Sequence, residues 1–492
     1  MEIFFNFLQV INFISWIFLF FYGMHYYYIC ILFLKKRKHY HLPEVKEIQT
    51  YPLVAVQLPI YNELYVVERL LDSIKELDWP KNRLEIQVLD DSTDETKQIV
   101  EEKVKKIKEE KPDLNIRIIR RKKREGFKAG ALKHGIELTD AEYFPVFDSD
   151  FLPEKDFLMK TIPYLMQDKK LAFVQTRWGH TNKDYSAFTY AQALGIDGHF
   201  VIEQSARNMN QLWMNFNGTA GVWRREAILD AGNWSGDTLT EDLDLSYRAQ
   251  LKGWTTLYLP DTVAPAEIPA FILPYKNQQF RWAKGSIQTA KKLIKPIIQS
   301  KFSFKNKFEA IVHLTYYSIH FLMILNILTL IPFILYPKKM IVPLYVPIFL
   351  FTISMISPVF LTFLAQLHLK NSIWKFIKAL PFLFFNGLGI TIYIAIAFME
   401  AVLNIQSAFK RTPKHNLSNN KKEMKPAKYK IKLQGIIIVE SLFAVFCFLQ
   451  VYWIAKYIHP VYIYFSFLLG ISTIYIIFKT LKDQFYFRNH SS

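Results

Sequence analysis

The chain has 492 residues, of which 51% are hydrophobic, 16% aromatic and 21% charged. This composition excludes a disordered chain, which would be poor in aromatic residues and rich in charge. The two cysteines, Cys30 and Cys447, lie far apart in apolar runs, so they predict neither a disulfide framework nor a thiolate metal site. The net charge of +18 would suggest a nucleic-acid partner in a soluble protein. In a protein with membrane spans, the same positive charge is typical of cytoplasmic loops, so we expect no nucleic-acid partner.

The first predicted domain is a transmembrane helix over residues 1–34. Residues 3–34 contain no Lys, Arg, Asp or Glu. This run is long enough to span a bilayer and longer than the apolar core of a signal peptide. A basic run, residues 35–38, follows at once. The positive-inside rule therefore predicts an N-terminus outside the cell and a cytoplasmic domain after the helix.

Residues 35–300 form the second predicted domain, in which short apolar runs alternate with polar helical stretches. The apolar runs are residues 54–58, 86–89, 116–119 and 143–147. This alternation predicts βαβ units around a mostly parallel, Rossmann-like sheet of the α/β class. We interpret the Lys- and Glu-rich stretch 95–124 as a solvated helix face and a basic turn, not as a binding arm.

Residues 301–492 form the third predicted region, which combines interfacial and transmembrane helices in a multi-pass integral membrane protein. Its apolar segments are residues 315–336, 341–367, 379–405, 434–458 and 461–478. If 379–405 crossed the bilayer, the very basic loop 406–433 would lie outside the cell, against the positive-inside rule. We therefore predict that 379–405 is re-entrant or interfacial and that the loop is cytoplasmic.

Two acidic clusters follow predicted strands. Asp90 and Asp91 end the second strand, and Asp148 and Asp150 end the fourth. In open α/β sheets, ligands bind outside the carboxyl ends of the strands. On an extended segment Asp148 and Asp150 would face the same side, where they suit Mg²⁺ or Mn²⁺ with substrate phosphates completing the shell. When this Asp-x-Asp pattern is taken alone, an ordinary turn at the end of a strand explains it better than a metal site does.

Other polar candidates have equally plain explanations when each is taken alone. Thr240 suits a helix N-cap with Glu241 and Asp242 in the first turn, which is ordinary helix-start chemistry. Lys128 is either a cation near phosphates or one more lysine of a basic stretch.

Three residues at helical spacing suggest a binding face. Gln278, Arg281 and Trp282 stand at i, i+3 and i+4, so they share one side of a helix. An arginine beside an indole suits a pyrophosphate with a stacked sugar. A surface arginine packed on a half-buried tryptophan fits the same spacing.

The order of the motifs resembles that of membrane-embedded family 2 glycosyltransferases, closest to the cellulose-synthase-like glucan and mannan synthases. In chain order the motifs are residues 58–63, 90–91, 128–131, 148–150, 216–219, 240–242 and 278–282. The segments NGTAGVWR at 217–224, RAQLKGW at 248–254 and FKRTPK at 409–414 point to that branch. The resemblance covers roughly residues 50–415, which is most of the chain.

The resemblance implies a GT-A fold joined to a helical transmembrane bundle. It implies inverting transfer of a hexose from a nucleotide sugar, UDP-glucose or GDP-mannose, to a growing β-glycan that crosses the membrane. By position, it assigns nucleotide-sugar binding to Asp90, Asp91, Lys128, Gln278 and Arg281, and the metal Mg²⁺ or Mn²⁺ to Asp148 and Asp150. It assigns the general base to Asp242, acceptor contacts to Trp282, Asn217 and Glu241, and a gating loop over the site to residues 409–414.

Two alternatives remain open from the sequence. A non-processive transferase with a lipid acceptor would share the Asp-x-Asp and Gln-x-x-Arg-Trp patterns, and the size of the product would discriminate between them. A transporter or channel with an inactive domain is disfavoured, because the apolar segments carry few ionisable groups and the predicted catalytic carboxylates are intact.

Overall fold

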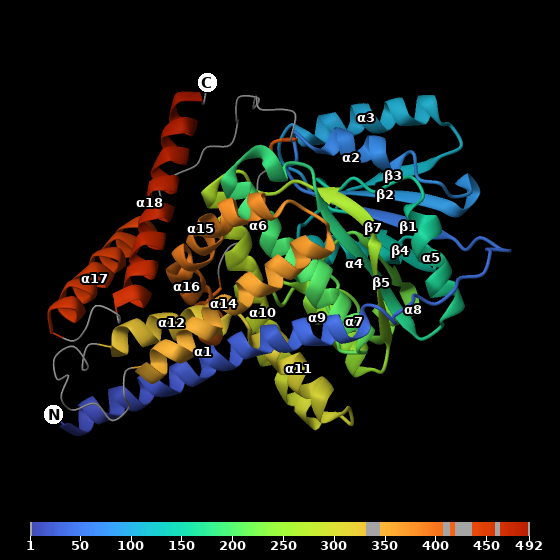
Figure 1. Ribbon diagram of the computed structural model, residues 1–492. Coiled ribbons are helices and arrows are strands. Elements are labelled where there is room, and N and C mark those ends of the chain that lie inside the picture. The colour runs from blue at the N-terminus through green and yellow to red at the C-terminus, as the bar shows by residue number, and fades with distance from the viewer. Residues whose placement is uncertain (1, 331–344, 407–413, 419–434, 458–462, 491–492) are drawn as a thin grey trace.

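The computed structural model describes residues 2–330, 345–406, 414–418, 435–457 and 463–490. An α/β sheet domain lies beside a large group of helices from both ends of the chain (Figure 1). In Figure 1, α1 runs past α12 and α14 toward the sheet domain, while α17 and α18 form a hairpin at the opposite side.

The sheet has seven strands in the order β3-β2-β1-β4-β6-β5-β7. Their bounds are β1 Val54–Ile60, β2 Leu84–Asp90, β3 Asn115–Ile119, β4 Tyr143–Val146, β5 Leu171–His180, β6 Gly221–Arg224 and β7 Thr255–Ala266. All pairings are parallel except those of β6, which runs antiparallel to both β4 and β5. The structure thus confirms the mostly parallel sheet and the four predicted strands, and it adds β5, β6 and β7.

Both faces of the sheet are covered, which explains why β1 is a nearly continuous apolar run. Val54, Val56 and Leu58 point into one core cluster, while Ala55 between them points into the other. The helices of this domain are α2 Val67–Ile74, α3 Thr96–Glu110, α4 Phe127–Glu137, α5 Phe157–Gln167, α6 Ala187–Asp197, α7 Ser205–Met209, α8 Arg225–Asp230 and α9 Glu241–Leu251. A π-helix, η3 Gly198–Gln204, joins α6 to α7, and short 3-10 turns cover Lys81–Arg83 and Lys183–Tyr185.

The remaining helices begin with α1 Glu2–Lys36 and resume after the sheet. They are α10 Ile272–Gln299, α11 Phe304–Thr315, α12 Ser318–Thr329, α14 Tyr345–His368, α15 Ile373–Gly389, α16 Thr391–Val402, α17 Ile436–Tyr457 and α18 Tyr464–His490. Within the described residues, five helices are long and apolar enough to cross a membrane, or six if the bent pair α11–α12 counts as one span.

Two apolar segments differ from the sequence prediction. The predicted span 315–336 begins inside a pair of helices, α11 and α12, bent by 64°, and residues 331–344 lie outside the described part. The predicted span 461–478 continues as a helix to His490, so Lys479 and Lys482 belong to α18. Asp483 in that extension accepts the Ile272 N–H at 2.7 Å, which ties the end of α18 to the start of α10.

Candidate active site

A cavity of about 230 Å³ opens at the carboxyl ends of β1, β2, β4, β5 and β7, and we call it the sheet-edge cavity. Its position follows from the parallel strands, whose ends and following loops meet at one edge of the sheet. The site residues predicted from the sequence that line it are Asp91, Lys128, Asp148, Asp150, Asn217, Glu241, Asp242, Gln278, Arg281 and Trp282. One cavity therefore gathers residues from six separate regions of the chain.

Asp90 is the predicted site residue that does not line this cavity. Its side chain is buried, with Oδ1 accepting the Ser92 N–H at 3.0 Å and Oδ2 accepting Arg120 Nε at 2.9 Å. The neighbouring Asp91 does line the cavity, and its carboxylate is held by Arg121. Asp90 therefore supports the loop after β2, while Asp91 is the member of the pair that lines the cavity.

Asp148 and Asp150 lie beyond the end of β4, where Ser149 and Asp150 form a turn. The predicted extended geometry is therefore wrong, because the Phe151 N–H bonds back to the Asp148 carbonyl at 3.0 Å and curls the segment. Both carboxylates nevertheless line the cavity.

Each of the two carboxylates is paired with a different lysine. Lys128 Nζ contacts Asp148 and donates to the Gly218 carbonyl at 2.8 Å. Lys414 Nζ lies 2.7 Å from Asp150 Oδ2, which also accepts the Glu267 N–H at 3.1 Å. Burial works against the charge on Lys128, but the carboxylates of Asp148 and Glu241 outweigh it and raise its pKa. Positive and negative side chains are thus paired along the cavity wall.

The donor set around Asp148 and Asp150 fits a divalent cation that is completed by a ligand. The Asp148 side chain keeps 38% of its surface exposed, while one oxygen of Asp150 is already engaged. Among the described residues, no group of three or more His, Cys, Asp or Glu is arranged to hold a metal ion. Mg²⁺ and Mn²⁺ accept such small protein donor sets when phosphate oxygens supply the remaining ligands.

Glu241 and Asp242 begin α9 at the floor of the cavity. Burial, reinforced by the adjacent Glu241 carboxylate, raises the pKa of Asp242 to about 7. Burial also raises the pKa of Glu241. A carboxylate with a pKa near the working pH is suited to accept a proton during catalysis. Thr240 stands at the N-cap position, but its side chain makes no capping hydrogen bond, and Glu241 and Asp242 occupy the first turn of α9.

Helix α10 supplies the opposite wall through Gln278, Arg281 and Trp282. All three line the sheet-edge cavity, as their spacing along one helix face predicts. The helix comes this close because Gly285 has no side chain, since a Cβ there would lie 2.5 Å from Thr240 Oγ1. The close approach of α10 to the start of α9 sets Arg281 near Glu241, Asp242 and Asp148, whose carboxylates attract its guanidinium.

The cavity also contains residues that the sequence reading did not single out as site residues. Arg124, from the stretch interpreted as solvated, lines the cavity with its guanidinium 3.4 Å from the centre of the Tyr61 ring. That interpretation is therefore wrong for the end of the stretch. His180 lines the cavity too, and its Nε2 lies 2.8 Å from Asp197 Oδ1. No local signal separated Arg124 from its basic neighbours, because only the fold turns it inward.

Lys414 is the described end of the predicted gating loop, whose residues 409–413 lie outside the described part. It lines the cavity, and the next residues are docked on the sheet domain. Glu267 accepts the backbone N–H of His415 at 2.7 Å and of Leu417 at 3.0 Å. Residues 414–418 therefore lie against the same edge of the sheet as the candidate active site.

A second, larger cavity of about 500 Å³ adjoins the first, and we call it the helix cavity. Its lining comes mainly from α1, α6, η3, α10, α11, α12, α14 and α15. Trp178, Asn217, Asp242, Gln278 and Trp282 line both cavities, so they mark the passage between them. A ligand held at Asp242 therefore faces the strand ends on one side and the membrane-helix candidates on the other.

Comparison with known proteins agrees with this architecture. Residues 52–285 match the model of the family "Glycosyltransferase like family 2". The structure of the mannosyltransferase PcManGT from Pyrobaculum calidifontis, in complex with GDP-Man and Mn²⁺, aligns with a TM-score of 0.52 at 20% identity. The alignment covers 81% of this chain and all of that one, and it shows the same fold. The sheet domain thus has a GT-A-like fold, and it matches the family 2 glycosyltransferase model over residues 52–285.

Plant proteins are similar to this chain over about half of its length. The chain is 43% identical over 255 residues to probable glucomannan 4-beta-mannosyltransferase 7 of Oryza sativa subsp. japonica, covering 51% of this chain and 43% of that protein. It is 42% identical over 255 residues to glucomannan 4-beta-mannosyltransferase 2 of Arabidopsis thaliana, covering 51% and 47%. The chain thus resembles the cellulose-synthase-like enzymes, and the match spans about half the length of these relatives.

Proposed function

We propose that this protein transfers a hexose, with mannose as the first candidate, from a nucleoside diphosphate sugar to a growing β-glycan. The observation that carries the proposal is the meeting, in one cavity, of the Asp242 carboxylate, whose pKa is raised to about 7, with the cationic side chains of Lys128 and Arg281. GDP-mannose is favoured over UDP-glucose because the plant relatives are named as mannosyltransferases.

In this proposal the acceptor hydroxyl attacks the anomeric carbon while the bond from that carbon to the diphosphate oxygen breaks. Asp242 accepts the hydroxyl proton, and no covalent intermediate is needed. Direct displacement inverts the anomeric configuration, so an α-linked donor gives a β-linked product. Arg281 and Lys128 line the same cavity and stabilise the negative charge on the departing diphosphate.

Asp148 and Asp150 would hold Mg²⁺ or Mn²⁺ with oxygens of the diphosphate. A bound divalent cation lowers the barrier by stabilising charge on the leaving group. For Asp148 to act in this way, its contact with Lys128 must loosen, which leaves the Lys128 ammonium available to the diphosphate. Until the donor arrives, the paired lysines hold both carboxylates in place at the cavity.

The acceptor glycan would approach Asp242 from the side of the helix cavity. Trp282 and Trp178 line both cavities, and indole rings provide flat apolar platforms for sugars without fixing their hydrogen bonds. After each transfer the lengthened chain would move into the helix cavity between α1, α12 and α14, which supports a processive enzyme that passes its product into the membrane.

In the proposed topology, the loop 406–433 lies in the cytoplasm and the N-terminus lies outside the cell. Both ends of the helix pair α15–α16 contact elements that flank the sheet domain. Lys375 Nζ lies 3.0 Å from Asp184 Oδ1 at one end, and Lys291 Nζ donates to the Val402 carbonyl at 2.7 Å at the other. These contacts favour an interfacial helix pair, although Ile373–Val402 is long and apolar enough to span.

Cysteine labelling tests this topology. A cysteine at Ser418 is expected to react with an impermeant thiol reagent only after the cells are permeabilised, whereas one at Ile3 is expected to react in intact cells. The native Cys30 and Cys447 are buried, so they give little background. Labelling of Ser418→Cys from outside would make Ile373–Val402 a true span.

The activity is tested with purified protein, GDP-mannose, UDP-glucose and related donors in the presence of Mn²⁺ or Mg²⁺. The expected product is a β-linked polymer, identified by linkage analysis, with GDP released in step with sugar incorporated. A single sugar attached to a lipid would favour the non-processive alternative. Release of nucleotide from none of the donors would overturn the proposal.

A further inference from the structure

A histidine–aspartate pair at the edge of the candidate active site has no part in the reaction proposed above. His180 ends β5 and lines the sheet-edge cavity, and its Nε2 lies 2.8 Å from Oδ1 of Asp197 at the end of α6. Only 7% of the surface of each side chain is exposed. Binding pockets use a small number of such precisely placed polar groups to orient a ligand, so the pair is a candidate for that role.

Both oxygens of the Asp197 carboxylate are occupied, which fixes the direction of the pair. Oδ1 faces His180, and Oδ2 accepts Gln366 Nε2 of α14 at 3.0 Å. Gln366 in turn accepts Asn371 Nδ2 at 2.8 Å, just beyond the end of that helix. Burial acts to raise the pKa of Asp197, but the attraction of His180 and the hydrogen bonds from His180 and Gln366 outweigh it and lower that pKa. Asp197 is therefore an ionised acceptor that is held from two sides.

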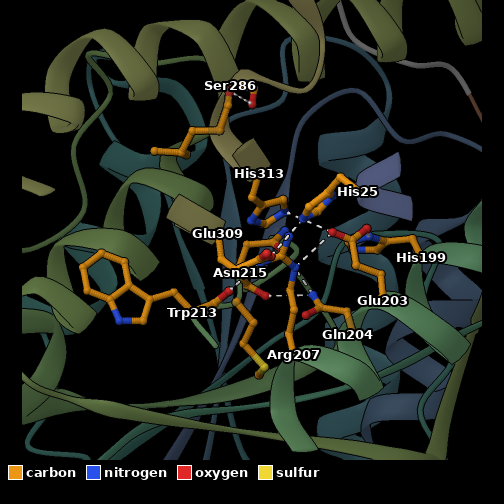
Figure 2. A network of polar contacts seen from close by, with 12 residues as sticks. His25, His199, Glu203, Gln204, Arg207, Trp213, Asn215, Ser286, Glu309 and His313 are labelled. Carbon is orange, nitrogen blue, oxygen red and sulfur yellow. Dashed lines mark hydrogen bonds and ion pairs between the residues drawn. The ribbon is translucent and has the colours of Figure 1, made fainter. Parts of the chain in front are cut away.

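The segment that follows Asp197 is held by a buried network of charged side chains (Figure 2). The π-helix η3 comes directly after Asp197, and Glu203 Oε1 within it lies 3.0 Å from Arg207 Nε. Arg207 Nη1 lies 3.7 Å from Glu309 Oε2, which also pairs with His25 Nε2 at 2.9 Å. These contacts tie η3 to α1 and α11, so the end of α6 cannot shift without breaking them. The carboxylate that faces His180 therefore has a fixed position.

This arrangement leaves one nitrogen of His180 for a ligand. An ionised carboxylate only accepts hydrogen bonds, so Nε2 carries the ring proton and the neutral ring has a lone pair at Nδ1. Among the described residues, Nδ1 has no hydrogen-bond partner. The ring to which this acceptor belongs lines the sheet-edge cavity. A hydroxyl group of a sugar is a donor that suits it.

The neighbours of His180 place it on the donor side of the cavity. Trp178 lies two residues earlier on β5, so the indole and the imidazole point to the same face of the strand. Ala266 of β7 pairs with His180 in register, and the next residue, Glu267, donates its N–H to Asp150 Oδ2 at 3.1 Å. The imidazole therefore lies on the side where Asp150 would hold the metal and the donor diphosphate.

We propose that His180 accepts a hydrogen bond from a hydroxyl of the donor hexose, with Trp178 as the flat surface beside that sugar. Asp197 and Gln366 are positioning residues, because they act only by fixing the orientation of the imidazole. The inference rests on the proposed function for the class of the ligand, a nucleoside diphosphate hexose. Such a contact selects among hexoses, because a sugar without the matching hydroxyl leaves the buried nitrogen unpaired.

The test uses His180→Gln in the full-length protein. The amide nitrogen of Gln can reach the position of Nε2, so this variant keeps the contact with Asp197 and loses the acceptor at Nδ1. His134→Gln is the matched control, because His134 lies on α4 with 38% of its side chain exposed and lines neither cavity. The KM for GDP-mannose and the Ki for GDP as a competitor are measured in the same polymerisation assay with Mn²⁺.

His180→Gln is expected to raise the KM for GDP-mannose about tenfold and to leave the Ki for GDP within about twofold, because GDP lacks the sugar. The control is expected to change neither value. Asp197→Asn removes the ionised acceptor that holds the ring in one orientation, so we expect a smaller split in the same direction. Equal changes of KM and Ki in His180→Gln would show a general disturbance of the site and would overturn the contact, as would no change in either value.

A second measurement separates the sugar of the donor from that of the acceptor. The KM for β-1,4-linked mannohexaose is expected to be unchanged in His180→Gln, since the proposed contact is with the donor. A rise in that value alone would assign the hydroxyl to the acceptor and would overturn the proposal.

Failure of this inference can be told apart from failure of the proposed function. If the wild type releases nucleotide from no sugar donor, the proposed function is wrong and the contact at His180 is wrong with it. If the wild type makes polymer from GDP-mannose and His180→Gln has the same kinetic constants, the proposed function stands and only the contact at His180 is wrong.

Discussion

A Cβ atom on Gly218 would lie 2.9 Å from Oδ2 of Asp242, which is closer than real side-chain carbons approach. The backbone of Gly218 has a φ of 79°, so an L-residue there would be strained as well as crowded. This contact places the turn before β6 directly against the candidate catalytic base. The Gly218 carbonyl also accepts Lys128 Nζ at 2.8 Å, so one turn positions both an acid–base group and a cation.

The first prediction follows from this contact. Gly218→Ala is expected to displace the Asp242 carboxylate and to lower turnover about 10²-fold, since small misplacements of reacting groups have effects of this size. Gly253→Ala is the matched control, because Gly253 has a φ of 95° but no atom within 4 Å of a built Cβ. Equal turnover in the two variants would show that strain, not contact with Asp242, matters at position 218.

Asp242→Asn is expected to keep donor binding and to lose turnover by about 10²- to 10⁴-fold, because Asn cannot accept the acceptor proton. Donor affinity is measured by titration with GDP-mannose, and turnover by polymer formation. The variant is expected to fold, since the Asn side chain has nearly the shape of Asp and its oxygen can still accept backbone N–H groups at the start of α9. Wild-type turnover in Asp242→Asn would remove Asp242 from the catalytic role.

The pH profile of transfer is expected to report on the same carboxylate. Because burial and Glu241 raise the pKa of Asp242 to about 7, the rate is expected to fall about tenfold per pH unit below 7 and to level off above it. The measurement is kcat/KM for the acceptor from pH 5 to 9. The residual activity of Asp242→Asn should lack this inflection, and a flat wild-type profile would contradict the assignment.

The raised pKa also has a consequence for stability. The folded state holds the Asp242 proton more tightly than the unfolded state, whose pKa is about 3.9. Stability from this group is therefore full below that value and is lost as the pH rises toward about 7. At pH 8, Asp242→Asn is expected to unfold at a temperature at least as high as the wild type, which a thermal melt in detergent measures. A clearly lower temperature would mean that the ionised carboxylate stabilises the fold.

Metal dependence is expected from the Asp148 and Asp150 carboxylates. A chelator such as EDTA should abolish transfer, and added Mn²⁺ or Mg²⁺ should restore it. Asp148→Asn is expected to lose activity even at high metal concentration, whereas Asp140→Asn, at an exposed position after α4, serves as the control. Full activity in the chelator would contradict the assignment of a metal to Asp148 and Asp150. It would not affect the assignment of Asp242 as the base.

Trp282 is expected to govern acceptor engagement more than donor chemistry. Trp282→Ala should reduce polymer yield far more than hydrolysis of the donor by water, and Trp282→Phe should restore part of the loss because it keeps an aromatic face. Released GDP and polymer are measured in the same reaction. Equal loss of both would make Trp282 a support for Arg281. Unchanged product length would favour the lipid-acceptor alternative.

Much of the sheet could be predicted from local patterns of apolar residues in the sequence. The first three strands and β4 were predictable because a strand buried on both faces is a short, continuous apolar run. The strands β5, β6 and β7 were not singled out, and β6 in particular is only four residues long. The antiparallel insertion of β6 between β4 and β5 depends on contacts across the sheet rather than on local periodicity.

The sequence by itself determined which residues come to the strand ends and which share the face of α10, because both follow from fixed spacings along one element. Only the tertiary structure decided their partners and their protonation. Lys414 reaches Asp150 across 264 residues of chain, and Arg124 turns inward from a basic stretch that reads as solvated. The pKa of Asp242 is raised mainly by desolvation, and the Gly218 turn and α10 both pack close to the start of α9. Such desolvation exists only after these distant segments have packed together.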